Sequence, residues 1–168
     1  MNYVLAVSGG VDSVVLLDAL VSDRFSELAP DYQLPTANYQ PLIAHFDHGI
    51  RPDSAEDAEW VRVLAAGYGL EYVSERVELG LGASESAARQ MRYNFLRQTC
   101  KKYNALLITA HHQDDVIETM VINLIRGTGW RGLTPMAAEI SDSQSPSILR
   151  PLLGVGKAQI LQYAKKYQ

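Results

Sequence analysis

Short apolar runs alternate with longer amphipathic segments along the chain. The apolar runs predict five strands, at residues 3–7, 42–46, 70–77, 106–110 and 148–153. The amphipathic segments predict helices at residues 13–21, from residue 54 onward, and at 85–103, 114–126 and 158–167. Such alternation is typical of an α/β fold, so we predict a doubly wound, mainly parallel five-stranded sheet with helices on both faces. Because ligands of such sheets bind at the carboxyl ends of the strands, the loops after Val7, Phe46 and Ala110 are expected along one edge.

Three of the helices have an apolar face that predicts burial. The helix that begins at Ser54, where Asp57 follows three residues later, is expected to bury Trp60, Val61, Leu64 and Ala65. In the helix at 85–103 the shared face carries Ala88, Met91 and Phe95. In the helix at 114–126 the residues expected to face the sheet are Val116, Ile117, Met120, Val121 and Leu124. Residues 23–40 have two prolines and no clean periodicity, which predicts a surface loop or insertion.

Length and composition limit the classes of protein to consider. The 168 residues predict one domain, 1–168, and 47% hydrophobic with 20% charged residues is typical of a globular protein. No apolar run is long enough for a membrane span, and no secretory signal opens the chain, so a cytoplasmic location is expected. Cys100 is the single cysteine, which excludes an internal disulfide, an iron–sulfur cage and an all-cysteine zinc site. The last predicted helix runs to Gln168 without a capping signal, so we expect the chain to be cut from something longer.

Charge is distributed unevenly around the net value of -4. Residues 1–85 hold 14 acidic and four basic side chains, whereas residues 86–168 hold five acidic and 11 basic ones. A basic half can bind phosphates even when the whole protein is acidic. We therefore regard nucleic acid as a permitted partner, although solvated helix faces would give the same pattern.

The segment from Ser8 to Ser13 joins the first predicted strand to the first helix. Its sequence is Ser-Gly-Gly-Val-Asp-Ser. The glycines allow close backbone approach, the amides at the helix N-terminus favour an anion, and the two hydroxyls add donors for phosphate oxygens. A Walker loop is absent, and Asp12 would repel phosphate unless a cation such as magnesium joins them. The alternative is a tight glycine turn with Asp12 at the helix start.

A second polar cluster, His111-His112-Gln113-Asp114-Asp115 with Glu118, follows the fourth predicted strand. Asp115 and Glu118 share one helix face, and we expect them to form a magnesium site that faces Asp12. Acids in a first helical turn also gain from the helix dipole, which is the simpler explanation. Adjacent histidines on an extended backbone point to opposite sides, which disfavours a zinc site built from His111, His112 and Asp115.

A glycine-rich segment at Gly127–Gly132 matches the Gly-x-Gly-x-x-Gly dinucleotide fingerprint letter for letter. It follows a predicted helix and precedes Leu133-Thr134-Pro135, whereas the fingerprint requires a strand before it and a helix after it. We therefore reject a dinucleotide site and predict a mobile glycine loop beside the substrate.

The loop at Ser8–Ser13 resembles the PP-loop of ATP pyrophosphatases. Further stretches resemble the tRNA(Ile)-lysidine synthetase family within that superfamily: His45 to Pro52, then Glu85 with Arg89, Arg92 and Tyr93, then His111 to Thr119, then Arg126 to Gly129 with Gly132-Leu133, and Arg150 to Leu153. These motifs cover almost the whole chain in the order of the family. Asp47 stands where the family usually has asparagine, a small departure.

The resemblance implies an ATP- and magnesium-dependent ligase that adenylates the wobble cytidine of an isoleucine tRNA with a CAU anticodon. Free L-lysine then attacks C2 of that cytidine, lysidine forms and AMP leaves. By the same resemblance, ATP is bound by Ser8, Gly9, Gly10, Val11, Asp12, Ser13, His45 and His111. Asp12, Asp115 and Glu118 would act in catalysis and hold magnesium. Family members continue into tRNA-binding domains, so the expectation is a catalytic core alone.

The basic half adds a prediction about tRNA, whose phosphates we expect to meet Arg89, Arg92, Arg126 or Arg131. Three alternatives are weighed against this interpretation. A related PP-loop enzyme that thiolates tRNA would need cysteine pairs, which Cys100 alone does not supply, and amidotransfer would need a glutaminase segment. A non-catalytic ATP-binding module would need the phosphate loop without Asp115 and Glu118.

Overall fold

The structure is a computed structural model that describes residues 2–33, 40–49, 54–78, 84–127, 137–142 and 145–167. Its strands are β1 (Asn2–Ala6), β2 (Leu42–Asp47), β3 (Tyr72–Arg76), β4 (Ala105–Ile108), β5 (Glu139–Asp142) and β6 (Ser145–Leu149). Its helices are α1 (Val11–Val21), α2 (Phe25–Leu28), α3 (Ser54–Gly67), α4 (Glu85–Tyr103), α5 (Gln113–Ile125) and α6 (Lys157–Tyr167). The predicted alternation of strands and helices is confirmed.

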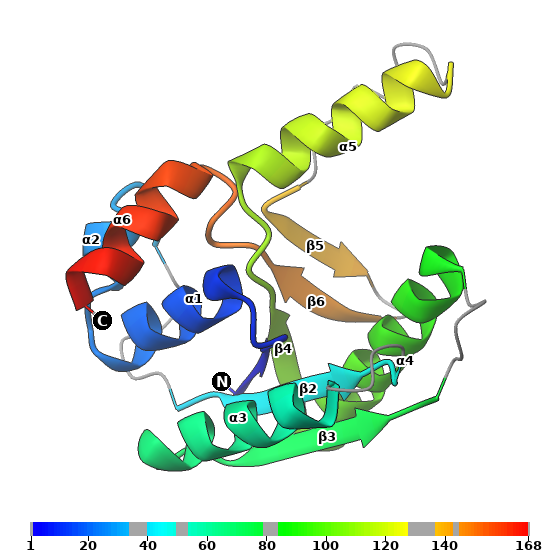
Figure 1. The fold of residues 1–168 in the computed structure, drawn as a ribbon. Coiled ribbons are helices and arrows are strands. Elements are labelled where there is room, and N and C mark those ends of the chain that lie inside the picture. Colours follow the sequence, from blue (N-terminus) through cyan, green and yellow to red (C-terminus); the bar gives the residue numbers. More distant parts are fainter. Residues whose placement is uncertain are drawn as a thin grey trace.

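The strands form one sheet in the order β3-β2-β1-β4-β6-β5 (Figure 1). The first five of these are parallel, as predicted, and the central strand β1 pairs with both β2 and β4. The edge strand β5 is antiparallel to β6 and was not predicted. Only four residues long, it has no sustained apolar run, so periodicity does not detect it.

Alternate residues of β1 enter two different cores, because successive side chains of a strand point to opposite faces. Tyr3 and Leu5 pack with residues of α1, α3 and α6, whereas Val4 packs with Phe95, Leu96 and Cys100 of α4. Helices therefore cover both faces of the sheet. This arrangement places the loops that follow β1, β2 and β4 at the edge where the parallel strands end (Figure 1).

Some predictions of side-chain burial are wrong. Trp60 is 48% exposed, because the face of α3 toward the sheet is centred on Val61 and Ala65, both fully buried. Met91 is also exposed, although Ala88 and Phe95 of the same helix are buried as predicted. Part of the predicted surface loop at 23–40 is the short helix α2, whose Leu28 is buried.

Helix α5 differs most from expectation. It has no buried residue, and Ile117, Val121 and Leu124, which were expected to face the sheet, are exposed. Figure 1 shows why: only its first turn lies at the sheet edge, and the rest of the helix extends away from the molecule. An apolar stripe indicates that a helix can be buried but not what covers it.

Candidate functional site

The loop between β1 and α1 is held by its own hydroxyl groups. The Ser13 hydroxyl accepts a hydrogen bond from the Ser8 amide at 3.2 Å and donates one to the Gly10 carbonyl at 2.9 Å. The Ser8 hydroxyl accepts from the Gly10 amide at 3.3 Å. Gly9 has a φ of +89°, which glycine adopts readily. Gly10 precedes α1 without a side-chain cap, so the loop presents an uncapped helix N-terminus, which favours an anion.

Asp12 and Asp115 come from different helices and meet at one imidazole. The Nε2 atom of His112 lies 3.7 Å from Asp12 Oδ2 and 3.7 Å from Asp115 Oδ2. The Oδ2 atoms of the two carboxylates are therefore no more than twice that distance apart. The sheet order explains their proximity, because β1 and β4 are neighbours and their helices begin side by side.

The third predicted acid, Glu118, does not join this group. It is exposed, about one turn further along α5 than Asp115. Among the described residues no three His, Cys, Asp or Glu side chains are arranged to hold a metal ion, and this includes the alternative set of His111, His112 and Asp115. Any cation here would need further ligands, such as the phosphate oxygens that magnesium commonly uses.

Lys157 at the start of α6 contacts this acidic group directly. Its ammonium lies 2.5 Å from Asp12 Oδ1, and its backbone amide donates to Asp114 Oδ2 at 2.8 Å. Sequence reasoning did not identify Lys157 as a site residue. The available signal was topological: α6 follows β6, which is the neighbour of β4 in the sheet, so its first turn also reaches this edge.

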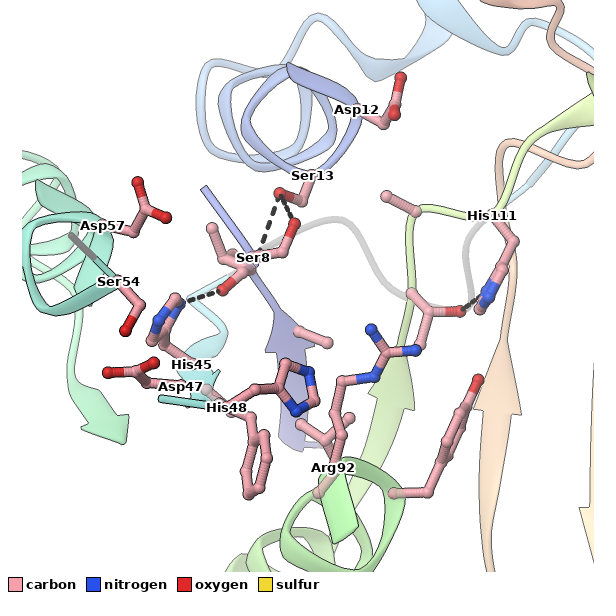
Figure 2. A pocket seen from close by; sticks show the side chains of 18 of the residues that line it. Ser8, Asp12, Ser13, His45, Asp47, His48, Ser54, Asp57, Arg92 and His111 are labelled. Atoms are coloured by element: carbon pink, nitrogen blue, oxygen red, sulfur yellow. Dashed lines mark hydrogen bonds between the residues drawn. The ribbon is translucent and has the colours of Figure 1, made fainter. Parts of the chain in front are cut away.

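A cavity of about 530 Å³ opens beside the loop, between the ends of β1, β2 and β4, the start of α3 and one face of α4 (Figure 2). This volume lies in the range of small-molecule sites. The lining includes Ser8, Asp12 and Ser13, which were predicted, and His48, Ser54, Asp57 and Thr109, which were not. The unpredicted residues come from loops and helix starts, where periodicity carries no information about direction.

The two histidines predicted to bind ATP, His45 and His111, both line the cavity. His45 is buried, with its Nδ1 2.8 Å from the Val7 carbonyl, so the backbone of β1 fixes its ring. Burial, and after it the charge of Arg150, lower the pKa of His111 to about 4. His111 is therefore neutral at pH 7, with its Nδ1 2.8 Å from the Thr109 hydroxyl. The two adjacent histidines, His111 and His112, do point to different surroundings, as predicted.

The opposite wall of the cavity carries His48 and Arg92. Figure 2 shows Arg92 extending from α4 into the space between His48 and His111. Burial and then the charge of Arg92 lower the pKa of His48, which is therefore also neutral at pH 7. Its Nδ1 atom is buried without a hydrogen-bond partner in the described structure. Such an atom favours a bound polar ligand, because an unpaired buried polar group is costly.

Asp47 holds the loop after β2 in place. Its carboxylate is paired with neighbouring groups of the protein and is not free to act on a bound ligand. Its Oδ1 accepts from the Gly49 amide at 2.8 Å, and its Oδ2 lies 3.1 Å from Arg76. Burial alone would raise the pKa of Asp47, but the Gly49 amide, Ser54 and Arg76 together lower it. Gly49 has a φ of +59°, and a Cβ there would lie 3.0 Å from the backbone of Glu78, so glycine is required.

Of the four arginines predicted to meet tRNA, the three in the described part of the chain lie in different surroundings. Arg92 lines the cavity, whereas Arg89 is exposed on the same helix, with both guanidinium groups within 5.7 Å of the Tyr93 ring. Arg126 lies at the outer end of α5. Arg131, like most of the glycine segment 127–132, lies outside the described residues. In the described ranges no helix has both the length and the apolar character to cross a membrane.

Comparison with known proteins agrees with this architecture. The whole chain, residues 1–168, matches the model of the PP-loop domain family, and the chain belongs to that family. The U34-tRNA thiolase NcsA from Methanococcus maripaludis superposes with a TM-score of 0.71 at 17% identity, over 98% of this chain and 56% of that one. NMN synthetase from Francisella tularensis gives 0.59 at 14% identity, over 98% and 60%. These two structures confirm the predicted fold class.

More specific relatives are found among curated sequences, and three of them carry the name tRNA(Ile)-lysidine synthase. The protein from Deinococcus deserti is 35% identical over 96% of this chain and 28% of its own length. Those from Idiomarina loihiensis and Lactobacillus gasseri are 35% and 33% identical over 98% of this chain, and 35% and 37% of their own lengths. The chain thus spans about a third of the relatives it matches.

Proposed function

We propose that this chain is the catalytic part of an enzyme that joins lysine to the C2 carbon of the wobble cytidine in a CAU-anticodon isoleucine tRNA, with ATP as the energy source. The observation that carries the proposal is the meeting of Asp12 and Asp115 at His112, next to the hydroxyl-braced loop and a cavity of about 530 Å³. The names of the relatives support this choice of substrates.

The reaction proceeds in two balanced steps. The O2 atom of the cytidine attacks the α-phosphorus of ATP, and pyrophosphate leaves. The ε-amine of lysine then attacks C2, a proton is lost from nitrogen, and the C2–O bond breaks to release AMP. Adenylation is required because the carbonyl oxygen would otherwise be a poor leaving group.

The loop between β1 and α1 binds the phosphates of ATP, and residues of the cavity wall add further contacts. The uncapped start of α1 holds phosphate oxygens through the amides of Gly9, Val11 and Asp12, since those of Gly10 and Ser13 already donate within the loop. His45 and the neutral His111 contribute from the cavity wall, and Arg92 supplies a positive charge opposite the developing charge on phosphate.

Asp12 and Asp115 fit a magnesium ion, because magnesium prefers one or two carboxylates together with phosphate oxygens. Glu118, on the same helix as Asp115, is the third acid of the proposed magnesium site. Bound magnesium would neutralise charge on the phosphates. The residues of this chain hold the acids in place: the His112 amide donates to Asp115 Oδ2 at 2.8 Å.

Thiolation is a weaker candidate. Cys100 of α4 is fully buried in the core, and burial raises the pKa of its thiol to about 12. A thiol in this state is a poor sulfur carrier, because the thiolate is the reactive form.

The test is to incubate the chain in molar excess over tRNA(Ile) transcript with ATP, magnesium and lysine, and then to analyse nucleosides by mass spectrometry. We expect lysidine at the wobble position, with release of AMP and pyrophosphate. Asp115→Asn and Glu118→Ala should each slow the reaction roughly 100-fold or more, typical of losing charge stabilisation at a reacting phosphate.

The matched control is Asp31→Asn, an exposed carboxylate near the end of the first described segment, which should leave the rate unchanged. With inorganic sulfide added beside lysine, a transcript that gains sulfur in place of lysine would contradict the proposal. So would pyrophosphate release that Asp115→Asn and Glu118→Ala leave unchanged.

A further inference from the structure

Lys157 holds a position at the phosphate loop that a divalent cation would also need. Its ammonium contacts Asp12 Oδ1, while Asp12 Oδ2 faces the imidazole of His112. Both carboxylate oxygens of Asp12, a predicted magnesium ligand, therefore already face nitrogen atoms of the protein. An incoming cation has to displace the ammonium before it can use that carboxylate fully.

The backbone of Lys157 is fixed, whereas its side chain has room to turn. The Lys157 amide donates to Asp114 Oδ2, and the Gln113 amide donates to the Val155 carbonyl at 3.0 Å, so the starts of α5 and α6 are joined. The Lys157 side chain is 37% exposed and the Asp12 side chain 28%. The ion pair is thus accessible to solvent and can exchange partners without moving the helix.

We propose that Lys157 is the resident counter-ion of Asp12 and makes uptake of a divalent cation depend on the nucleotide. Without nucleotide, the lysine stabilises Asp12 and competes with the metal. When a triphosphate arrives, its oxygens offer the ammonium an alternative anion and supply the metal with missing ligands. Metal and nucleotide then strengthen each other's binding, since coupling between two ligands is reciprocal. Lys157 acts through Asp12 and is a positioning residue.

Direct measurement of metal binding tests the idea, with Mn²⁺ as the probe and electron paramagnetic resonance as the readout. Free Mn²⁺ is titrated into the chain alone, and then in the presence of a non-hydrolysable α,β-methylene ATP analogue. In the unmodified chain we expect weak binding alone and strong binding with the analogue. Lys157→Met should tighten binding in the nucleotide-free chain roughly 30-fold, as expected for removing one unit charge about 4 Å from a divalent cation in water. The coupling factor should fall by a similar amount.

Two variants serve as controls. Lys157→Arg keeps the charge and should behave like the unmodified chain. Lys165→Met makes the same substitution at an exposed position of the same helix and should change nothing. The proposal is overturned if Lys157→Met binds free Mn²⁺ no more tightly than the unmodified chain, or if its coupling factor is unchanged.

A second measurement needs no Lys157→Met protein. Lysine Cε signals are followed by NMR in the unmodified chain, and the Lys157 signal is assigned by its loss in Lys157→Arg. We expect it to shift when Mg²⁺ and the analogue are added together but not with Mg²⁺ alone. A full shift with Mg²⁺ alone would overturn the proposal. The inference rests on the proposed ATP chemistry but not on tRNA or lysine, so its failure would leave lysidine formation untouched, and failed lysidine formation would leave metal coupling intact.

Discussion

The titratable residues of the cavity differ in which interactions determine their charge. His48 and His111 are kept neutral by burial, while Asp47 is kept charged by an amide, a hydroxyl and a guanidinium. The Asp12 carboxylate faces Lys157 and the loop between β1 and α1. A free lysine amine is almost entirely protonated at pH 7, so the proposed reaction needs a group that removes a proton or a site that disfavours the charged amine. The lowered pKa values of His48 and His111 make both imidazoles weaker bases than free histidine, so they are poor candidates for removing that proton.

His111 should make stability depend on pH in the acid range. Its pKa falls from 6.5 in the unfolded chain to about 4 in the folded one, so the unfolded state binds more protons between these values. The contribution of His111 is complete above pH 6.5 and is lost as the pH falls toward 4. The free energy of unfolding, measured with urea, should be lower at pH 5.0 than at pH 7.5 by about 2 kcal/mol because of this residue.

His111→Gln is the comparison, because it removes the titrating group and keeps a polar side chain. The decrease in unfolding free energy between the two pH values should be smaller by that amount in the variant. Identical decreases in the two proteins would show that His111 titrates normally in the folded chain.

At the scale of elements, α1, α3 and α6 are joined by one carboxylate. Asp18 of α1 accepts hydrogen bonds from Tyr68, which follows α3, and from Tyr163 of α6, both at 2.7 Å, and it pairs with Arg24 at 3.1 Å. Burial alone would raise the pKa of Asp18, but the two tyrosines and Arg24 lower it. Burial, and then the hydrogen bond to Asp18, raise the pKa of Tyr68 to about 12. The carboxylate therefore fixes how α6, which carries Lys157, sits against α1.

Asp18→Ala should destabilise the protein by about 2–4 kcal/mol, because it leaves the hydroxyls of Tyr68 and Tyr163 and the guanidinium of Arg24 without their acceptor. Chemical denaturation at pH 7 measures this effect. Glu59→Ala, which breaks the exposed ion pair with Arg62, should leave the unfolding free energy nearly unchanged. Equal losses in the two variants would contradict the joining role of Asp18.

The exposed apolar residues of α5 are expected to contribute little to the stability of this chain. Ile125 is 80% exposed, so Ile125→Lys should change the unfolding free energy of this chain by less than about 0.5 kcal/mol. Leu107→Ala, at a fully buried position of β4, should cost about 2–5 kcal/mol. Thermal or urea unfolding compares the two. A large loss from Ile125→Lys would mean that α5 is covered by the chain in solution.

At the scale of the whole molecule, the two halves of the chain differ in charge. The basic half contributes α4, with Arg89 and Arg97 around Tyr93, and the acidic half contributes β2, α3 and β3. A tRNA bound at the cavity would therefore approach over α4, since its phosphates are attracted to that side.

Binding of tRNA should weaken steeply with salt. If two phosphates are contacted, affinity should fall roughly tenfold between 50 and 200 mM salt, as filter binding would show. Arg89→Gln should reduce the logarithmic slope by about one contact, whereas Arg62→Gln in the acidic half should leave it unchanged. A flat salt dependence would remove the proposed role of the arginines.

The sequence by itself determined the parallel sheet, the loop at Ser8–Ser13 and the acids at the start of α5, because these depend on local periodicity and on helix starts. Tertiary structure decided the rest. It brought Asp12 and Asp115 to one imidazole, left Glu118 outside that group, and turned Arg92 into the cavity. It also placed Lys157 on Asp12 across 145 residues of chain. Such contacts depend on which strands are neighbours, and strand order is a property of the folded sheet that no local window of sequence contains.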